Sequence, residues 1–123
     1  MNDFIRYLKP KRWKVLQVLP IVGQNDSKID NFKISETEFQ IFIGNHINLQ
    51  DITNIVPETN SQIKGAYAMV DPAGRFFDNA TGTHNYSRQI LEVGVRTAIQ
   101  EVNYDLQKFI ARGGQYDWEK QPQ

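Results

Sequence analysis

The sequence predicts a small domain that mixes helices and strands, of the α/β or α+β class. Three observations support this prediction. Residues 12–19 have the composition of a buried strand, a capping signal at Ser35 begins an amphipathic segment, and Asp71-Pro72-Ala73-Gly74 separates two short extended segments. Because 123 residues suit one small domain, we expect a single domain over residues 1–123.

The first predicted element is the strand at residues 12–19, which is rich in Val, Leu and Trp and is followed by Pro20. Side chains alternate along a strand, so Arg12 and Lys14 share one face with the apolar Leu16. Two cations at the start of an otherwise apolar strand face must contact solvent, an acidic partner or a ligand.

A helix is expected next. Ser35 and Glu38 have the spacing of a capping box, and Ile34 and Phe39 have that of a hydrophobic staple. Apolar residues then recur at helical spacing to about His46. This pattern predicts a helix and contains no candidate catalytic or binding residue.

A hairpin is expected in the middle of the chain. Residues 67–70 and 75–77 flank the Asp-Pro-Ala-Gly segment, and Pro at the second position with Gly at the last is typical of a type I turn. Before this hairpin, residues 52–56 are a short strand candidate that Pro57 is expected to stop. Residues 58–64 can hold one helical turn.

Two helices are expected after the hairpin. Residues 80–86 are interpreted as a loop, after which Ser87 would cap a helix over about residues 89–102. Asp105 can cap a last helix, and Gly113-Gly114 supply a left-handed stop at its end.

The composition of the chain excludes several classes of function. The chain has 14 Lys and Arg residues together and 14 Asp and Glu residues together, so its net charge is zero. Nothing in this balance indicates a surface that binds nucleic acid. No apolar run approaches the ~18 residues of a membrane span, and residues 1–11 do not resemble a signal peptide. With no cysteine, disulfides and thiolate metal sites are excluded, and His46 and His84 form no metal motif. We therefore expect a soluble cytoplasmic protein without a membrane partner, a nucleic-acid partner or a metal site.

Some residues are candidates for chemistry, each with a structural alternative. Arg12 and Lys14 would lie ~7 Å apart on a strand, which suits a polyphosphate, or they are solvated charges. Arg112 beside two glycines suits a closely approached anion, although the same glycines suit a helix C-cap, which the residues alone favour. His84 is a candidate general acid or base, or alternatively an ordinary surface residue. Tyr67 is interpreted as a packing residue.

Four segments in order and in register carry a resemblance to a known family. They are residues 10–17 (Pro-Lys-Arg-Trp-Lys-Val-Leu-Gln), 56–60 (Val-Pro-Glu-Thr-Asn), 90–95 (Ile-Leu-Glu-Val-Gly-Val) and 112–118 (Arg-Gly-Gly-Gln-Tyr-Asp-Trp). Together they resemble the carboxy-terminal part of the viperin family of radical SAM proteins, over about Lys9 to Trp118. Residues 66–79 look like the prokaryotic branch of that family.

The resemblance implies a fold and an activity. The family has a partial (β/α) barrel, whose late strand would be residues 12–19, and a carboxy-terminal extension from about residue 50 to 118 with a β-hairpin and two helices. It uses S-adenosylmethionine and a [4Fe–4S] cluster. It converts a ribonucleoside triphosphate to its 3′-deoxy-3′,4′-didehydro form in antiviral defence.

Residue by residue, the resemblance implies a triphosphate site. Arg12 and Lys14 match the basic pair that grips the triphosphate, and Arg112, with Gly113 and Gly114, matches a tail that closes over the nucleotide.

Two further residues carry over as catalytic candidates. Tyr67 matches a tyrosine at the substrate that is a candidate donor of the final hydrogen. His84 falls where animal members have a lysine near the ribose, a departure that leaves its acid–base role and the preferred base open.

The family's CxxxCxxC motif has no counterpart here, because the chain has no cysteine. We therefore expect no cofactor in this chain alone, and catalysis only with a cysteine-bearing partner chain. The alternatives are a stand-alone nucleotide-binding or regulatory module and a non-functional truncated remnant that dimerises. A homo-oligomer is expected, joined at an edge of the strand at residues 12–19.

Overall fold

The computed structural model describes residues 1–115 and divides the chain into two compact units, residues 1–63 and the residues from Lys64 onward. Both helices and strands are present, with one parallel and one antiparallel sheet, so the mixed fold class is confirmed. No barrel closes among residues 1–115. The single-domain expectation stays a prediction.

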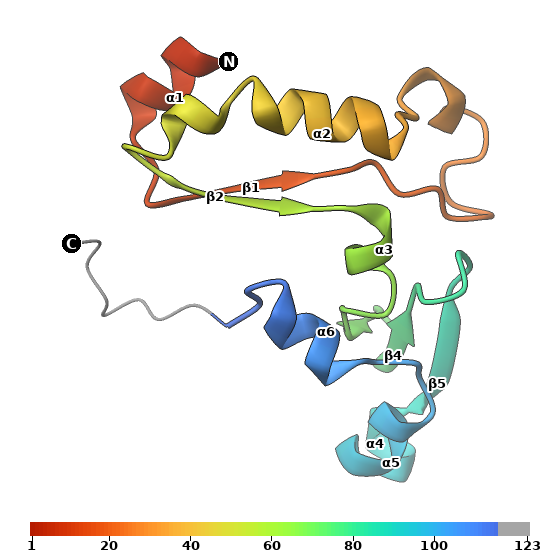
Figure 1. Cartoon of the computed structure of the whole chain (residues 1–123). Helices are drawn as coiled ribbons and strands as arrows, with labels where there is room; N and C mark the ends of the chain where they lie inside the picture. The colour runs from red at the N-terminus through yellow and green to blue at the C-terminus, as the bar shows by residue number, and fades with distance from the viewer. Residues whose placement is uncertain (116–123) are drawn as a thin grey trace. The chain divides into compact units, whose positions relative to one another are not determined.

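The first unit is built around two parallel strands joined through a helix. Its elements are α1 (Asn2–Leu8), β1 (Arg12–Leu16), η1 (Ile29–Asn31), α2 (Glu36–Gly44), η2 (Ile47–Leu49), β2 (Asn54–Glu58) and α3 (Asn60–Ile63). Figure 1 shows α2 running along the β1–β2 pair. A parallel pair requires such a crossover, because its strands run in the same direction.

The core of this unit lies on one face of the two strands. Ile5 of α1, Leu49 and Ile55 form the buried cluster, and Trp13 and Val15 pack against it. The ring of Trp13 also meets two rings from the α2 region edge-on, with centroids at 6.4 Å for Phe42 and 5.5 Å for His46. Alternation along β1 therefore places the side chains of Arg12, Lys14 and Leu16 on the opposite face.

The capping box is confirmed. The backbone N–H of Ser35 donates to Glu38 Oε2 at 2.8 Å, and Ser35 Oγ accepts from the backbone N–H of Glu38 at 3.2 Å. The helix it begins ends at Gly44, after which a 3₁₀ turn follows.

The expectation that Pro57 stops the second strand is wrong. β2 continues through Pro57 to Glu58. The backbone N–H of Asn54 donates to Lys11 O, and Glu58 O accepts from the backbone N–H of Gln17, so the even-numbered residues of β2 bond to β1. Pro57, which is odd-numbered, directs its ring nitrogen away from β1, and no hydrogen bond of the ladder is lost.

β1 is shorter than expected and ends at Leu16. After Glu58 the chain turns into α3, so the residues beyond Gln17 have no β2 residue to pair with. The side chain of Gln17 is buried and accepts from the backbone N–H of Asn60 at 2.9 Å.

The second unit is an antiparallel sheet followed by short helices. Its elements are β3 (Met69–Val70), β4 (Arg75–Asp78), β5 (Asn85–Gln89), α4 (Ile90–Val93), α5 (Val95–Gln100) and α6 (Leu106–Ala111). The hairpin between β3 and β4 is confirmed, with the Gly74 N–H donating to Asp71 O at 3.0 Å. The cap at Asp105 is also confirmed, since its Oδ1 accepts from the backbone N–H of Lys108 at 3.0 Å.

Two expectations in this unit are wrong. Ser87 lies inside β5 and caps no helix; its Oγ accepts from the backbone N–H of Phe76 at 3.0 Å. The expected helix over residues 89–102 is present as two shorter helices, α4 and α5, because Gly94 has φ 81° and ψ 155° and interrupts the helix. Apolar spacing alone does not detect this break, since two short helices preserve the same pattern.

A buried carboxylate organises the second unit. Asp78 is fully buried and accepts from the backbone N–H groups of Ala80 at 2.9 Å and Asn103 at 2.7 Å, and from the Asn85 side chain at 3.2 Å. It thereby ties β4 and β5 to the segment before α6, and its role is structural.

Candidate functional site

The first candidate group is the polar face of β1. Arg12, Lys14 and Leu16 pair in register with Asn54, Val56 and Glu58 of β2, and register partners on parallel strands share a face. Lys14 Nζ lies 2.8 Å from Glu58 Oε1. The Glu58 side chain is fully buried, whereas that of Lys14 is 38% exposed.

This ion pair has two consequences. It holds the Lys14 ammonium in one place, and it offsets one of the two positive charges on this face of β1. The sequence left an acidic partner open for these cations, but naming Glu58 required the parallel register, which joins residues 44 positions apart.

The second candidate group is a stack of side chains in the second unit. The guanidinium carbon of Arg112 lies 4.0 Å from the centre of the Tyr67 ring and 4.9 Å from the centre of the Phe109 ring. Arg112 is only 7% exposed, and its Nη2 donates to Ala66 O at 3.5 Å. Two residues that the resemblance marks as functional, Tyr67 and Arg112, are therefore in direct contact.

The two glycines that follow Arg112 differ in what they do. Gly113 has φ 74°, which confirms the left-handed stop at the end of α6. A Cβ atom at Gly114 would lie 2.4 Å from Phe109 O and 2.6 Å from the Phe109 ring, so this position has no room for a side chain. Tyr116, Asp117 and Trp118 of the same motif lie outside the described residues.

His84 lies between β4 and β5 in an aromatic cluster. Its ring meets the Phe77 ring edge-on at 4.9 Å, and its Nδ1 lies 3.4 Å from the hydroxyl of Tyr86. Arg75 lies over the other aromatic member, 4.5 Å from the centre of the Tyr86 ring. The side chains of this cluster are half-exposed. The acid–base role of His84 stays a prediction.

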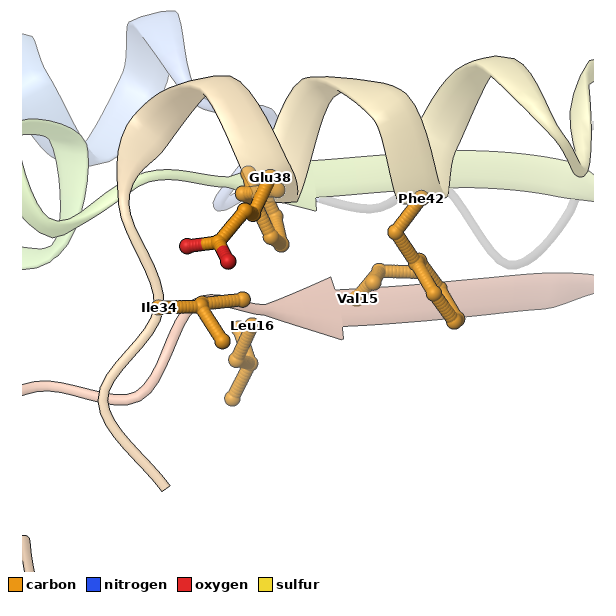
Figure 2. A pocket seen from close by; sticks show the side chains of 6 residues that line it. Val15, Leu16, Ile34, Glu38 and Phe42 are labelled. Atoms are coloured by element: carbon orange, nitrogen blue, oxygen red, sulfur yellow. The ribbon is translucent and has the colours of Figure 1, made fainter. Parts of the chain in front are cut away.

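Figure 2 shows an apolar cavity of about 330 Å³ between α2 and β1. Its lining consists of Val15, Leu16, Ile34, Glu38, Phe39 and Phe42. The one carboxylate here, Glu38, is engaged in the capping box, where hydrogen bonds from Ser35 lower its pKa. This lining suits an apolar group and offers a triphosphate no positive charge.

Within residues 1–115, no three His, Cys, Asp or Glu side chains gather as a metal site would require. The same described part of the chain contains no helix long and apolar enough to cross a membrane.

Comparison with known proteins identifies the family. No family model matches the sequence. The chain is 64% identical over 118 residues to an S-adenosylmethionine-dependent nucleotide dehydratase from Lacinutrix mariniflava, and 49% identical over 118 residues to one from Flammeovirga pacifica. Each match covers 96% of the chain. The chain matches one segment of the proteins of the viperin-like nucleotide dehydratase family.

The relationship extends to vertebrates. The chain is 38% identical over 125 residues to the S-adenosylmethionine-dependent nucleotide dehydratase RSAD2 from Oncorhynchus mykiss. It spans 24%, 40% and 35% of the lengths of these three nucleotide dehydratases. The resemblance drawn from the four sequence segments is thereby confirmed.

Proposed function

We propose that this chain contributes triphosphate-binding residues to a viperin-like nucleotide dehydratase whose substrate is a ribonucleoside triphosphate. The observation that carries the proposal is the placement of Arg12 and Lys14 on one face of β1, two residues and thus ~7 Å apart. That separation suits adjacent phosphates, and a guanidinium can bind phosphate oxygens in a bidentate manner.

The Lys14–Glu58 ion pair fits this proposal. An ammonium held at 2.8 Å by a buried carboxylate does not have to be ordered again when a ligand binds. In the second unit, the resemblance implies a phosphate-binding cation at Arg112, and Gly113 and Gly114 shape the backbone that follows it. The relatives' name, nucleotide dehydratase, supports a nucleotide as the ligand.

The chemistry of the proposed reaction requires more than this chain. The family's cluster is held by cysteine thiolates, and the sequence contains none, so these residues do not fit a [4Fe–4S] cluster. The thiolates would come from another polypeptide or from the rest of a longer one. In that assembly Tyr67 would donate the final hydrogen, and His84 would act near the ribose.

A stand-alone nucleotide-binding or regulatory module is the second candidate. The observation in its favour is that each cationic group is assembled inside its own compact unit. Lys14 and Glu58 belong to the first unit, and Tyr67, Phe109 and Arg112 belong to the second. Neither group needs a cysteine-bearing partner to form.

The test is calorimetric titration of the full chain with a ribonucleoside triphosphate. We expect binding, and we expect Arg12→Ala to weaken it about tenfold or more, since charge-assisted contacts contribute roughly 1.5–3 kcal/mol. Lys11→Ala removes a neighbouring exposed cation just before β1 and is the control. Equal affinities of the wild type and Arg12→Ala would refute the assignment of Arg12.

Binding without catalysis would favour the module over the enzyme part. Restoration of nucleotide conversion by a cysteine-bearing relative chain would favour the enzyme part. No binding of any triphosphate by the chain would contradict the stand-alone module, and failure of a cysteine-bearing chain to restore conversion as well would leave the non-functional remnant.

A further inference from the structure

The two histidines of the chain have different hydrogen-bond partners at Nδ1. The Nδ1 atom of His46 lies 2.7 Å from Phe42 O. A carbonyl oxygen can only accept, so Nδ1 of His46 carries a hydrogen, and Nε2 of the neutral ring is left as an acceptor. The Nδ1 atom of His84 instead lies 3.4 Å from the hydroxyl oxygen of Tyr86, a group that can donate.

The chemistry of the His84–Tyr86 pair favours one direction for its hydrogen bond. A phenol is a stronger acid than the N–H of a neutral imidazole, and an imidazole nitrogen is a stronger base than a phenol oxygen. Tyr86 therefore donates to Nδ1, and the neutral His84 ring carries its hydrogen on Nε2. When the ring is protonated, Nδ1–H donates to the Tyr86 oxygen and Nε2 keeps its hydrogen. Nε2 of His84 is thus a donor in both protonation states.

Neighbouring side chains hold the two rings in this relation. The Tyr86 ring stacks with the Phe77 ring, with centroids 5.5 Å apart and an interplanar angle of 25°, and the guanidinium carbon of Arg75 lies 4.5 Å from its centre. The imidazole meets the Phe77 ring edge-on at 4.9 Å and stands at 88° to the Tyr86 ring. The contact of 3.4 Å is longer than the ~2.8 Å usual for a hydroxyl donor, so the hydroxyl biases the imidazole and does not lock it.

The second ring nitrogen of His84 is open to a ligand. The His84 side chain is half-exposed, and within residues 1–115 its Nε2 atom has no hydrogen-bond partner. A nitrogen that carries a hydrogen suits an acceptor on a bound molecule, such as a ribose oxygen. It does not suit the removal of a proton, because a base needs a free lone pair.

We propose that Tyr86 is a positioning residue that keeps His84 in the Nε2–H form, so that His84 donates a hydrogen bond to a ribose oxygen of the nucleotide and does not act as a general base. The ligand is that of the proposed function, on which this role of His84 rests. The tautomer of His84 is independent of any ligand and can be measured separately.

The first arm of the test records the histidine tautomers of the full chain without ligand, by long-range proton–nitrogen NMR in alkaline buffer. The variant His84→Gln assigns the signals. We expect the Nε2–H form for His84 and the Nδ1–H form for His46. In Tyr86→Phe, which keeps the aromatic ring, the ratio of Nε2–H to Nδ1–H in His84 should fall about two- to fivefold.

The control for this arm is Tyr7→Phe, which removes the hydroxyl of a tyrosine that is 84% exposed and should change neither histidine. A merely structural role of Tyr86 would lower the unfolding temperature in Tyr86→Phe and leave the tautomer ratio unchanged. That result, or an Nδ1–H form of His84 in the wild type, would overturn the positioning role.

The second arm compares the common ribonucleoside triphosphates with their 2′,3′-dideoxy counterparts in calorimetric titrations. The wild type should bind a ribonucleotide about three- to tenfold more tightly than its dideoxy counterpart, since only the former has ribose hydroxyl oxygens to accept from Nε2. This preference should be lost in His84→Ala and retained in His84→Lys, whose ammonium donates and cannot accept. Because the two ligands carry the same phosphates, the added charge in His84→Lys cancels in the comparison.

The outcomes of the second arm separate this proposal from the proposed function. If the wild type binds no triphosphate, nucleotide binding by the chain alone is refuted, and the tautomer measurement decides the role of Tyr86. If the wild type binds a ribonucleotide and its dideoxy counterpart equally, nucleotide binding stands and the donor role of His84 is refuted. A preference that persists in His84→Ala would refute that role as well.

Discussion

Removing Lys14 should destabilise the first unit, because it takes a cation away from a buried carboxylate. Glu58 is fully buried, and its Oε1 lies 2.8 Å from Lys14 Nζ. Breaking a fully buried pair costs about 3–5 kcal/mol, whereas an exposed pair contributes about 0–1 kcal/mol. Since the Lys14 side chain is 38% exposed, we expect Lys14→Met to lower the free energy of unfolding by about 2–3 kcal/mol.

The partner variant should behave differently. In Glu58→Gln the lysine can turn toward solvent, so the loss should be smaller, about 1 kcal/mol. The double variant should recover part of the loss in Lys14→Met, because a neutral glutamine no longer needs a counter-charge. The cycle should therefore give a coupling energy of about 1 kcal/mol or more.

The assay is urea unfolding followed by the fluorescence of Trp13, which lies on β1 beside Lys14. Trp118→Phe serves as the common background, so that a single tryptophan reports on the first unit. A loss of about 2–3 kcal/mol shifts the midpoint by roughly 1–2 M urea for a small unit. Lys11→Met makes the same chemical change at an exposed position and should stay within about 0.5 kcal/mol of the wild type.

Two outcomes would refute the reasoning about Lys14 and Glu58. One is a loss in Lys14→Met no larger than in Lys11→Met, which would mean that the pair behaves as a surface pair. The other is a coupling energy near zero. The same variants also test the ligand assignment, since Glu58→Gln raises the net positive charge beside Arg12 and should strengthen triphosphate binding several-fold.

Three further predictions address the cofactor, acid stability and assembly. Reconstitution of the purified chain with iron and sulfide should give no [4Fe–4S] cluster and no S-adenosylmethionine cleavage, because the sequence has no cysteine; cluster absorbance at stoichiometric iron would contradict this. Hydrogen bonds from Arg75 hold the pKa of Asp71 below its ordinary value, so the turn is stabilised above the ordinary Asp pKa and loses this stability as the pH falls through the lower folded value. The protection factor of the Gly74 amide, which is its intrinsic exchange rate divided by the observed rate, should fall over that acid range in the wild type and stay constant in Asp71→Asn. Light scattering at about micromolar concentration should show a homo-oligomer, since the first unit exposes several large apolar side chains, and a clean monomer would contradict it.

The sequence predicted the elements whose signals lie within a few residues. The capping box at Ser35, the turn that ends at Gly74 and the cap at Asp105 each depend on hydrogen bonds between residues three positions apart. Such contacts form wherever the local segment adopts its preferred conformation, so the residue types alone identify them.

Features that depend on distant pairing were not predicted. Whether Pro57 ends a strand depends on which side of β2 faces β1, and that side is set by the parallel register. The partner of Lys14 follows from the same register. The break at Gly94 was missed for another reason, because a glycine inside an apolar pattern indicates a lower helix propensity without showing which backbone conformation it adopts.

In the motif at residues 112–114 the structural interpretation is confirmed, and the proposed functional interpretation is compatible with it. On the residues alone, Arg112-Gly113-Gly114 suited either an anion site or a helix C-cap. Gly113 ends α6 through its positive φ, and Gly114 leaves room for the Phe109 ring. That ring lies against the guanidinium that also contacts Tyr67, 45 residues earlier in the chain. Arg112 thus lies both at the C-cap of α6 and against the Tyr67 ring, so a substitution that disturbs the cap should also disturb this contact.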